Sequence, residues 1–340
     1  MNLLKQSDAP SYTLLAFIPH SAQAAYLAIR AFNIEIARIA DTASTPTVAA
    51  MRMTFWRDAI RKALVGTPPK QPVSVLLAHA AESLHRRTEG HETLSLNWFL
   101  RIISEREKYI NNNPYPTLES LERYAENTYS TLLYLTLQAL PLNSITADHV
   151  ASHIGKASGI VTVLRGLPLI AFPAPTNHHS NDAGLNPDVA AQRQRSRQGA
   201  VLLPLDVMAE AGVREEDVLR KGAEAEGLRD AVFQVATRAS DHLITARTMI
   251  QNLRKGQEVG HDFEHETEEE HAQKRHGDGS VAEQADDIDY AFGALMPAVS
   301  TQLWLDKLQS LDFDIFRDDL RRRDWRLPVK AWLANRRKEF

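Results

Sequence analysis

Apolar residues recur at spacings of three and four along most of this chain, and we find no convincing run with the alternation or β-branched content of a strand. Residues 20–39 illustrate the pattern, because Tyr26, Ile29, Phe32 and Ile36 fall on one face of a helix. The side chains of such a helix cover a core along a single stripe. The sequence therefore predicts an all-α protein.

Proline and capping residues predict where the individual helices begin and end. Thr45 is expected to cap a helix that carries Trp56, Pro72 suits the first turn of the next one, and Thr117 is expected to cap a later one. The helix that follows Thr146 should stop at Pro168, since proline lacks the backbone donor that a helix interior needs. Further helices are expected over about 94–108, 228–253 and 290–308.

The charge of the chain is unevenly distributed. The net charge is -4, but residues 256–287 carry eleven acidic and two basic residues, so the remaining 308 positions have 37 basic and 32 acidic residues, or +5. This mildly basic body suits a phosphate-bearing ligand or an anionic membrane surface, and lacks the strongly basic face of a nucleic-acid binder. The absence of cysteine excludes disulfides, thiolate metal sites and a cysteine nucleophile.

Two segments do not follow the helical pattern. Residues 173–198 are polar and rich in turn formers, and are expected to form a loop insertion. Residues 256–287 hold too few apolar side chains to offset the entropy of ordering, so this acidic insertion is expected to be disordered. Its histidines, His261, His265, His271 and His276, suit either a solvated tract or weak binding of zinc or nickel.

No uninterrupted apolar run of membrane-spanning length occurs, so no transmembrane helix is predicted. The first twelve residues, MNLLKQSDAPSY, show neither a signal peptide nor the Arg-rich pattern of a mitochondrial presequence. From these residues alone, either a cytosolic protein or one whose leader is missing from this chain is expected.

Four blocks of sequence occur in a recognisable order: AYLAIRAFNIEIARIAD at 25–41, HIGKASGIVTVLRGLP at 153–168, QGAVLLPLDVMAEAGV at 198–213 and ALMPAVSTQLWLDKL at 294–308. They resemble the two aspartate-rich helices and the later conserved segments of the squalene and phytoene synthase family. The resemblance implies one isoprenoid-synthase-like helical domain around a central cavity, covering residues 12–310, with residues 311–340 as a basic helical tail.

In enzymes of that family, each aspartate-rich helix carries an Asp-x-x-x-Asp pair, and the pairs hold the magnesium ions that neutralise a diphosphate leaving group. On this sequence the first pair falls on Ala37 and Asp41, and the second on Gly166 and Ile170. Three of the four carboxylates are therefore absent. Glu35 cannot complete the first pair, because six residues separate it from Asp41 and turn it about 120° away. The resemblance thus implies a retained fold, no catalytic residues and no resident cofactor, with magnesium as the alternative.

Four residues are the candidates for lining the cavity: Asp41, Arg165, Tyr124 and Asn127. Asp41 and Arg165 are expected to face it from two neighbouring helices. Arg165 lies on an otherwise apolar helix, so it should either pair with a carboxylate, Asp41 or Glu126, or contact a ligand phosphate. Asp41 alternatively contacts only solvent or a neighbouring base. His149 and His153 have a metal-compatible spacing of four, but no third ligand is evident, so no metal site is predicted.

The departures from the enzyme pattern resemble one branch of the family, through blocks at 51–60, 71–77, 124–137, 148–168 and 313–320. That branch assists assembly of mitochondrial respiratory complex I, the NADH dehydrogenase. The resemblance implies a non-catalytic protein on the matrix side of the inner membrane, with complex I subunits or assembly intermediates as partners and a peripheral membrane contact. The alternative is a prenyltransferase or lipid-modifying enzyme that uses prenyl diphosphate and magnesium.

The tail has a pattern typical of an interfacial helix. Residues 317–338 hold nine basic and three acidic residues together with two tryptophans. If Pro328 opens a helix, Val329, Trp332 and Leu333 share one face. This face is expected either to pack on the domain or to contact a membrane.

Overall fold

The computed structural model describes residues 1–43, 45–173, 199–257 and 280–340, and every regular element within them is a helix, as the sequence predicted. The longer helices are α3 (His20–Ala37), α5 (Pro46–Leu64), α6 (Pro72–Arg87), α7 (Leu96–Lys108), α9 (Thr131–Ala139), α10 (Ile145–Ala171), α14 (Leu228–Arg254), α16 (Val281–Leu295), α17 (Pro297–Ser310) and α18 (Leu327–Arg337). The shorter helical elements are α1 (Asn2–Ser7), α2 (Ala9–Leu14), η1 (Leu15–Phe17), α4 (Ile39–Thr42), α8 (Leu118–Ala125), η2 (Glu126–Ser130), α12 (Leu205–Glu210), α13 (Glu215–Lys221), η4 (Gly222–Glu224) and η5 (Asp318–Arg321).

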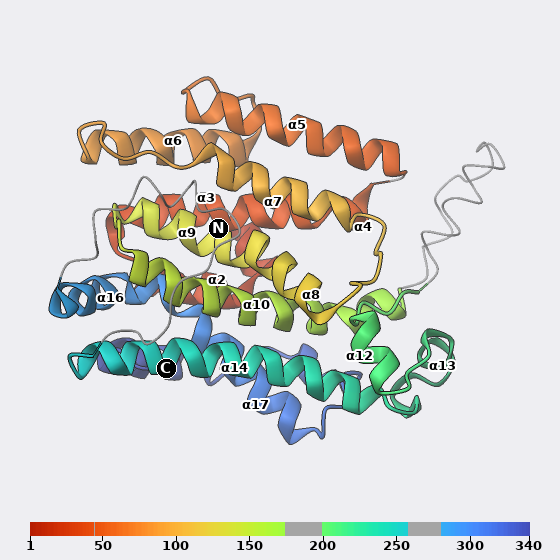
Figure 1. Ribbon diagram of the computed structural model, residues 1–340. Coiled ribbons are helices and arrows are strands. Elements are labelled where there is room, and N and C mark those ends of the chain that lie inside the picture. Colours follow the sequence, from red (N-terminus) through yellow and green to blue (C-terminus); the bar gives the residue numbers. More distant parts are fainter. Residues whose placement is uncertain (44, 174–198, 258–279) are drawn as a thin grey trace.

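The helices stack in layers around α10 (Figure 1). Helices α5 and α6 pack on each other and form the outer layer at the top of the view, above α3 and α7. Below them, α10 contacts α8, η2 and α9 on one side and α14, α16 and α17 on the other. The described N-terminal elements also belong to this body, since Leu4 of α1 is buried in the main core.

The central helix α10 is the one described helix that is long and apolar enough to cross a membrane. The sequence predicted no such helix. Most of its apolar window is nevertheless buried inside the protein, in contact with six other elements. A helix in a protein core can have the same hydrophobic composition as a membrane span, and α10 packs as such a core helix over most of its surface.

Two glycines allow α10 to lie against the backbone of the preceding helical segment. A Cβ atom at Gly155 would lie 2.3 Å from the Cα of Ser130, and one at Gly159 would lie 2.5 Å from the Cβ of Ala125. Ser130 ends η2, a π-helical segment inserted between α8 and α9. The close approach of these helices therefore depends on the missing side chains of Gly155 and Gly159.

The predicted helix starts are confirmed where a local capping residue sets them. The hydroxyl of Thr45 accepts a hydrogen bond from the backbone of Val48, and that of Thr117 accepts one from Ser120. Pro72 stands in the first turn of α6. These caps satisfy backbone donors that would otherwise lack partners at the helix start.

Two helix boundaries differ from the sequence prediction. Helix α10 continues through Pro168 to Ala171, because Leu167, Pro168 and Ala171 are all buried and this packing outweighs the loss of one backbone hydrogen bond. The helix expected over 290–308 is two helices, since Pro297 ends α16 and opens α17 in its first turn.

The two predicted insertions lie mostly outside the described residues, which omit 174–198 and 258–279. The four histidines of the acidic insertion are among the residues that are not described. The expectation of disorder does not hold for residues 281–287, which form the first two turns of α16. The side chain of Ser280 caps that helix, and the Glu283 carboxylate accepts a hydrogen bond from the backbone N–H of Ser280.

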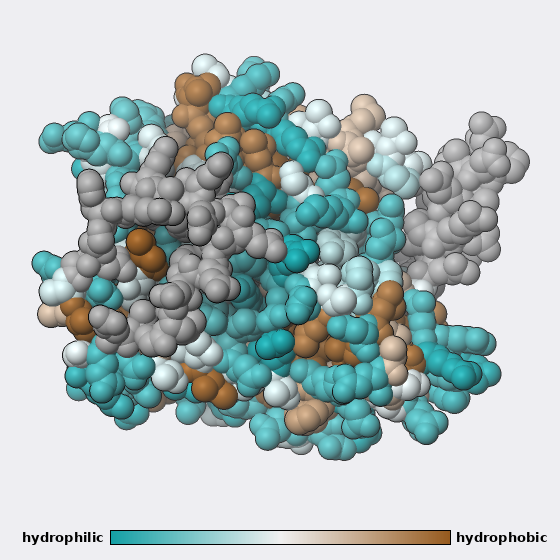
Figure 2. Space-filling view, viewed as in Figure 1, coloured by the Kyte–Doolittle hydropathy of each residue, from teal (hydrophilic) through white to brown (hydrophobic). Residues whose placement is uncertain are grey.

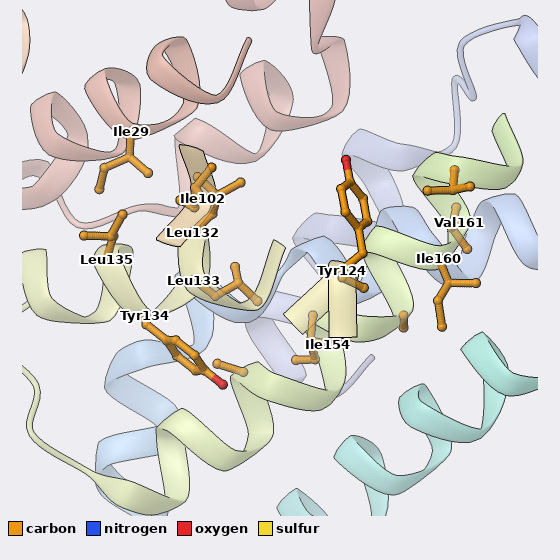
Figure 3. Packing of buried hydrophobic residues seen from close by; sticks show 14 of the residues in the cluster. Ile29, Ile102, Tyr124, Leu132, Leu133, Tyr134, Leu135, Ile154, Ile160 and Val161 are labelled. Carbon is orange, nitrogen blue, oxygen red and sulfur yellow. The ribbon is translucent and has the colours of Figure 1, made fainter. Parts of the chain in front are cut away.

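Leucine and isoleucine side chains from several helices meet in the main core (Figure 3). Ile29 of α3, Ile102 of α7, and Leu132 and Leu135 of α9 are all fully buried there. Most of the described surface in the view of Figure 2 is hydrophilic, with apolar side chains in small separate groups. The fold therefore buries its apolar residues around α3, α9 and α10, which also position the polar groups described next.

Candidate functional site

A small hollow lies between α2, α3, η2, α10 and α17. Its volume is about 60 Å³, which is room for a few water molecules and well below the roughly 300 Å³ of the smallest usual ligand pockets. The ring of Tyr129 lines it together with polar side chains from several elements: Asp8, Arg30, Ser158, Arg165 and Ser300.

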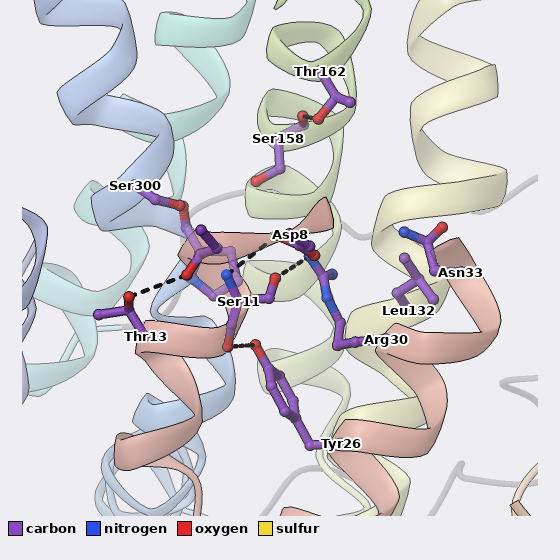
Figure 4. Close-up of polar contacts among 12 residues, drawn as sticks. Asp8, Ser11, Thr13, Tyr26, Arg30, Asn33, Leu132, Ser158, Thr162 and Ser300 are labelled. Atoms are coloured by element: carbon purple, nitrogen blue, oxygen red, sulfur yellow. Dashed lines mark hydrogen bonds and ion pairs between the residues drawn. The ribbon is translucent and has the colours of Figure 1, made fainter. Parts of the chain in front are cut away.

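Asp8 and Arg30 form an ion pair that lines this hollow (Figure 4). Nη2 of Arg30 on α3 lies 2.8 Å from Oδ2 of Asp8, and it also donates a hydrogen bond to the hydroxyl of Ser11. Both charged side chains are largely buried, with 11% of Arg30 and 18% of Asp8 exposed. Nε of Arg30 is buried without a hydrogen-bond partner among the described residues. The cation that faces the hollow is therefore already compensated by a carboxylate of the chain.

Local geometry fixes Asp8 in this position. Asp8 is the N-cap of α2, and its Oδ1 accepts a hydrogen bond from the backbone of Ser11. Burial alone would raise the pKa of Asp8, but the Arg30 charge and the Ser11 hydrogen bonds hold it below its ordinary value of 3.8. The hydroxyl of Tyr26, one turn before Arg30, donates to the backbone carbonyl of Ser11, and burial raises the pKa of Tyr26 to about 12. Asp8 is thus ionised and Tyr26 neutral near pH 7.

A second buried arginine lies on α7. Arg106 donates from Nη2 to Oδ1 of Asn33 at 2.7 Å and from Nη1 to the hydroxyl of Tyr124 at 3.2 Å, and its guanidinium lies over the ring of Tyr129. Its Nε is buried without a hydrogen-bond partner among the described residues. Arg106 therefore fills the interior between α3, α7 and α8 with hydrogen bonds to neutral groups.

The structure brings two of the predicted cavity residues, Tyr124 and Asn127, against α7. The hydroxyl of Tyr124 accepts from Arg106, and burial raises the pKa of Tyr124 above 10.0 against the opposing effect of that cation. The amide of Asn127 donates to Oε2 of the buried Glu105 at 3.2 Å. Neither residue lines the hollow beside Arg30, so their predicted role in binding a ligand stays a prediction.

The expectation that Asp41 and Arg165 face one cavity is wrong. Asp41 lies on α4 with an exposed side chain, although burial of part of the carboxyl raises its pKa above 3.8 against the nearby charge of Arg38. Arg165 is also exposed, and it borders the hollow from the outer part of α10. Helix α10 is apolar on average, but position 165 falls on its solvent side, so Arg165 does not need the buried partner that the sequence suggested.

The proposed partner of Arg165 is engaged elsewhere. Glu126 is buried, and its two oxygens accept hydrogen bonds from the hydroxyls of Tyr134 at 2.6 Å and Ser152 at 2.7 Å. Nζ of Lys156 lies 3.9 Å from Oε2 of the same carboxylate. No described residue forms an ion pair with Arg165.

A second and larger hollow, of about 290 Å³, lies between α3, α4 and α5. Glu35, Arg38 and Arg52 line it together with the rings of Phe55 and Trp56. Arg52 donates to the hydroxyl of Thr42 at 2.8 Å. Asp41 does not line this hollow, so Glu35 and Asp41 do not form one carboxylate pair, as the sequence predicted.

The histidine pair of α10 acquires a third member from α14. The rings of His149 and His153 are 5.2 Å apart, and Nδ1 of His153 lies 3.0 Å from Nδ1 of His242. Nε2 of His242 lies 2.7 Å from Oε1 of Glu122, with Arg238 beside the same oxygen. Burial would raise the pKa of Glu122, but His242 and Arg238 lower it below 4.5. This cluster ties α8, α10 and α14 together.

The described residues do not fit the magnesium site of the prenyl-transferring enzymes. Of the four positions that would supply carboxylates, Ala37, Gly166 and Ile170 have none, and Asp41 is exposed. Within residues 1–43, 45–173, 199–257 and 280–340, no three acidic or histidine side chains are grouped so that they could hold a metal ion. We therefore derive no metal-assisted step for this site.

Sequence reasoning missed Asp8, Arg30 and Arg106. One signal was available for Arg30, because it lies four residues after Tyr26 and interrupts the apolar face of 20–39. A second was available for Asp8, three residues before Ser11 in a helix-capping pattern. Chemically, the arrangement offers hydrogen bonds and a compensated charge.

Similarity to known proteins covers nearly the whole chain. The squalene/phytoene synthase family model matches residues 4–169 and 188–332. Complex I assembly factor 6 of Rattus norvegicus is 35% identical over all 340 residues, which cover 82% of that protein, and the protein of the same name in Homo sapiens is 31% identical over the same span. The Drosophila melanogaster homolog is 32% identical over 255 residues, covering 73% of this chain and 66% of that protein.

Solved structures give the same fold. A dehydrosqualene synthase with a bound ligand has a TM-score of 0.63 at 11% identity, covering 99% of this chain and 94% of that one. The squalene synthase HpnC from Alicyclobacillus acidocaldarius has a TM-score of 0.59 at 13% identity, covering 92% of each chain. At these identities the likeness concerns the fold alone. The family match and the full-length relatives together establish that this chain belongs to the squalene/phytoene synthase family, in the branch of the complex I assembly factor 6 proteins.

Proposed function

We propose that this protein is a non-catalytic assembly factor for mitochondrial respiratory complex I. It acts from the matrix side of the inner membrane, where it supports biogenesis of the membrane arm by binding complex I subunits or assembly intermediates. The observation that carries the proposal is the 35% identity to a complex I assembly factor along the complete chain.

The interior of the protein supports a role without prenyl transfer. The hollow beside Arg30 has a volume of about 60 Å³, and the carboxylate of Asp8 already neutralises the charge of that arginine. A prenyl diphosphate needs both a long apolar cavity and several cations to balance its leaving group. The hollow of about 60 Å³ is too small for a prenyl chain, and three of the four positions that hold metal-binding carboxylates in the enzymes carry none here.

One observation favours the alternative, a prenyltransferase or lipid-modifying enzyme. Arg165 borders the hollow and no described residue forms an ion pair with it, so a cation remains available there for a phosphate group. Incubating the pure protein with magnesium and farnesyl or geranylgeranyl diphosphate tests this alternative. We expect no release of pyrophosphate above the blank, and turnover that Asp41→Ala abolishes would establish the enzyme instead.

The assembly role is tested by deleting the gene in the native organism. We expect NADH:ubiquinone activity to fall, with partly assembled complex I visible on native gels and activities of the other respiratory complexes unchanged. Re-expression of the wild-type protein should restore the activity. Normal complex I in the deletion strain would exclude the proposed role.

Location and partners require separate measurements in the same strain. A tagged protein should fractionate with mitochondria and be released from inner-membrane vesicles by high salt, as a peripheral protein is. Crosslinking in intact mitochondria should recover membrane-arm subunits. Recovery of the protein only from the cytosol would contradict the matrix-side location.

A further inference from the structure

Three large apolar side chains near the C-terminus are more than half exposed to solvent. Trp325 is 82% exposed, Val329 is 57% exposed and Trp332 is 52% exposed. At 100° per residue, Val329 and Trp332 point in similar directions from α18, and Trp325 lies in the turn just before that helix. We call these three residues, with Lys330 and Arg337, the tail surface.

The opposite face of α18 holds the helix on the protein. Leu327, Ala331 and Ala334 are buried in a small apolar cluster with residues of α2, α16 and α17. The helix expected at Pro328 is thus present, and it packs on the domain through one face while the tail surface stays free. Trp325 and Trp332 are therefore held outward by a docked helix.

The charge around the tail surface is positive. Residues 317–338 hold nine basic and three acidic residues, and the three acids are already engaged in ion pairs with neighbouring arginines: Asp318 with Arg321, Asp319 with Arg322, and Asp324 with Arg326. Lys330 and Arg337 have no such partner among the described residues, and the guanidinium of Arg336 lies over the ring of Trp332. Free cations thus flank the exposed tryptophans.

This combination fits a lipid surface better than a peptide. None of the tail-surface residues lines either of the two hollows described above. Tryptophan rings prefer the headgroup level of a bilayer, and lysine and arginine beside them reach anionic headgroups. We propose that the tail surface attaches the protein to an anionic bilayer, with Trp325 and Trp332 inserted at headgroup level.

The proposal rests on the membrane-side role given above and names the surface responsible. It also has a test that does not involve complex I. If the protein does not bind vesicles but deletion of its gene still impairs complex I, only the lipid surface is overturned. If the protein binds vesicles but complex I is normal in the deletion strain, only the assembly role is overturned.

Flotation of the full-length protein with vesicles tests the attachment. We expect it to float with vesicles of phosphatidylcholine and cardiolipin at low salt, and to stay at the bottom with phosphatidylcholine alone. Trp325→Ser with Trp332→Ser should weaken binding at least about tenfold, and Lys330→Glu with Arg337→Glu should weaken it and flatten its dependence on salt. Absence of flotation, or equal flotation of the tryptophan variant, would overturn the proposal.

A matched control uses exposed apolar residues elsewhere. Ile244 of α14 and Tyr290 of α16 are each about half exposed, so Ile244→Ser with Tyr290→Ser removes two exposed apolar side chains away from the tail. This variant should float like the wild type, and all variants should keep the wild-type circular dichroism and melting temperature. A control variant that loses binding as strongly as the tail variant would show that attachment is not specific to the tail surface.

Tryptophan fluorescence gives an independent readout of insertion. The chain has five tryptophans, and the three others, Trp56, Trp98 and Trp304, are buried in the protein. Anionic vesicles should therefore shift the emission of Trp325 and Trp332 to shorter wavelength, and brominated lipids should quench it. Flotation without a shift or quenching of the emission would overturn lipid insertion. Binding to a complex I subunit through these tryptophans, in the absence of lipid binding, would overturn it too and would assign the surface to a protein partner.

Discussion

Oδ2 of Asp8 lies 2.8 Å from Nη2 of Arg30, so the residue that caps α2 also neutralises a cation in the middle of α3. The two residues are 22 positions apart in the sequence. Their pairing secures the N-terminal helices to the body and balances a charge at the wall of the hollow. Removing one partner leaves the other charge largely buried and uncompensated.

Asp8→Asn should therefore lower the free energy of unfolding by about 2–4 kcal/mol, because Arg30 loses its carboxylate and the cap of α2 weakens. Urea denaturation followed by circular dichroism measures this change. Glu82→Gln is the matched control, since the exposed Glu82–Arg86 pair on α6 should contribute less than about 1 kcal/mol. Equal and small effects of the two substitutions would show that the Asp8–Arg30 pair does not stabilise the fold.

The contribution of Asp8 should depend on pH in a defined direction. Its folded-state pKa lies below the ordinary 3.8, so its stabilisation is complete above that unfolded-state value and is lost as pH falls through the lower folded-state pKa. The difference in unfolding free energy between wild type and Asp8→Asn should stay constant from about pH 5 to 7 and shrink below about pH 4. A difference that grows on acidification would contradict the assigned ion pair.

Two glycines of α10 should respond to alanine in opposite ways. A Cβ at Gly155 meets the Ser130 backbone at 2.3 Å, so Gly155→Ala should destabilise the protein by about 1–3 kcal/mol or more. At Gly166 a Cβ meets only the end of Ile170, at 3.9 Å, so Gly166→Ala should stabilise it by about 0.5–1 kcal/mol. Melting temperatures of the two variants compare them directly, and a stabilising Gly155→Ala would refute the close packing of α10 on η2.

Asp41→Ala should leave complex I unaffected in cells. The side chain is exposed on α4, and in the part of the chain that the structure describes no second carboxylate shares a metal site with it. The measurement is NADH:ubiquinone activity in the deletion strain re-expressing the variant, at a protein level matched to the wild type by immunoblot. A variant that is stable yet fails to restore activity would place Asp41 in a functional site.

Features set by neighbouring residues were predictable from the sequence. The caps at Thr45 and Thr117 and the helix start at Pro72 are local, because each depends on residues within one turn. Helix α10 at Pro168 departs from the prediction since its end is decided by burial against other helices. The start of α16 was missed for another reason: Ser280 and Glu283 form a local capping box, but the composition of the surrounding stretch led to an expectation of disorder.

The site was less predictable because its contacts join distant parts of the chain. His153 and His242 are 89 residues apart, and Arg106 and Asn33 are 73 apart. The resemblance to the aspartate-rich helices predicted which carboxylate positions of the family are empty in this chain, and that assignment stays a prediction. The same resemblance placed Arg165 toward the interior, however, because the apolar composition of α10 does not reveal which of its faces meets solvent.

The π-helical segment η2 has a consequence for how the length of this chain can vary. It sets the rotation of α9 relative to α8, and that rotation brings the hydroxyl of Tyr134 to Glu126. A π turn holds about one residue more than an α-helical turn, so deleting one residue from Glu126–Ser130 would let these positions close as ordinary α-helix and would keep α9 nearly at its present rotation. The same deletion inside α9 would turn the rest of that helix by about 100° and move its leucines out of the core. Relatives that differ by one residue in this region should therefore differ within Glu126–Ser130, and the flanking helices should keep their length.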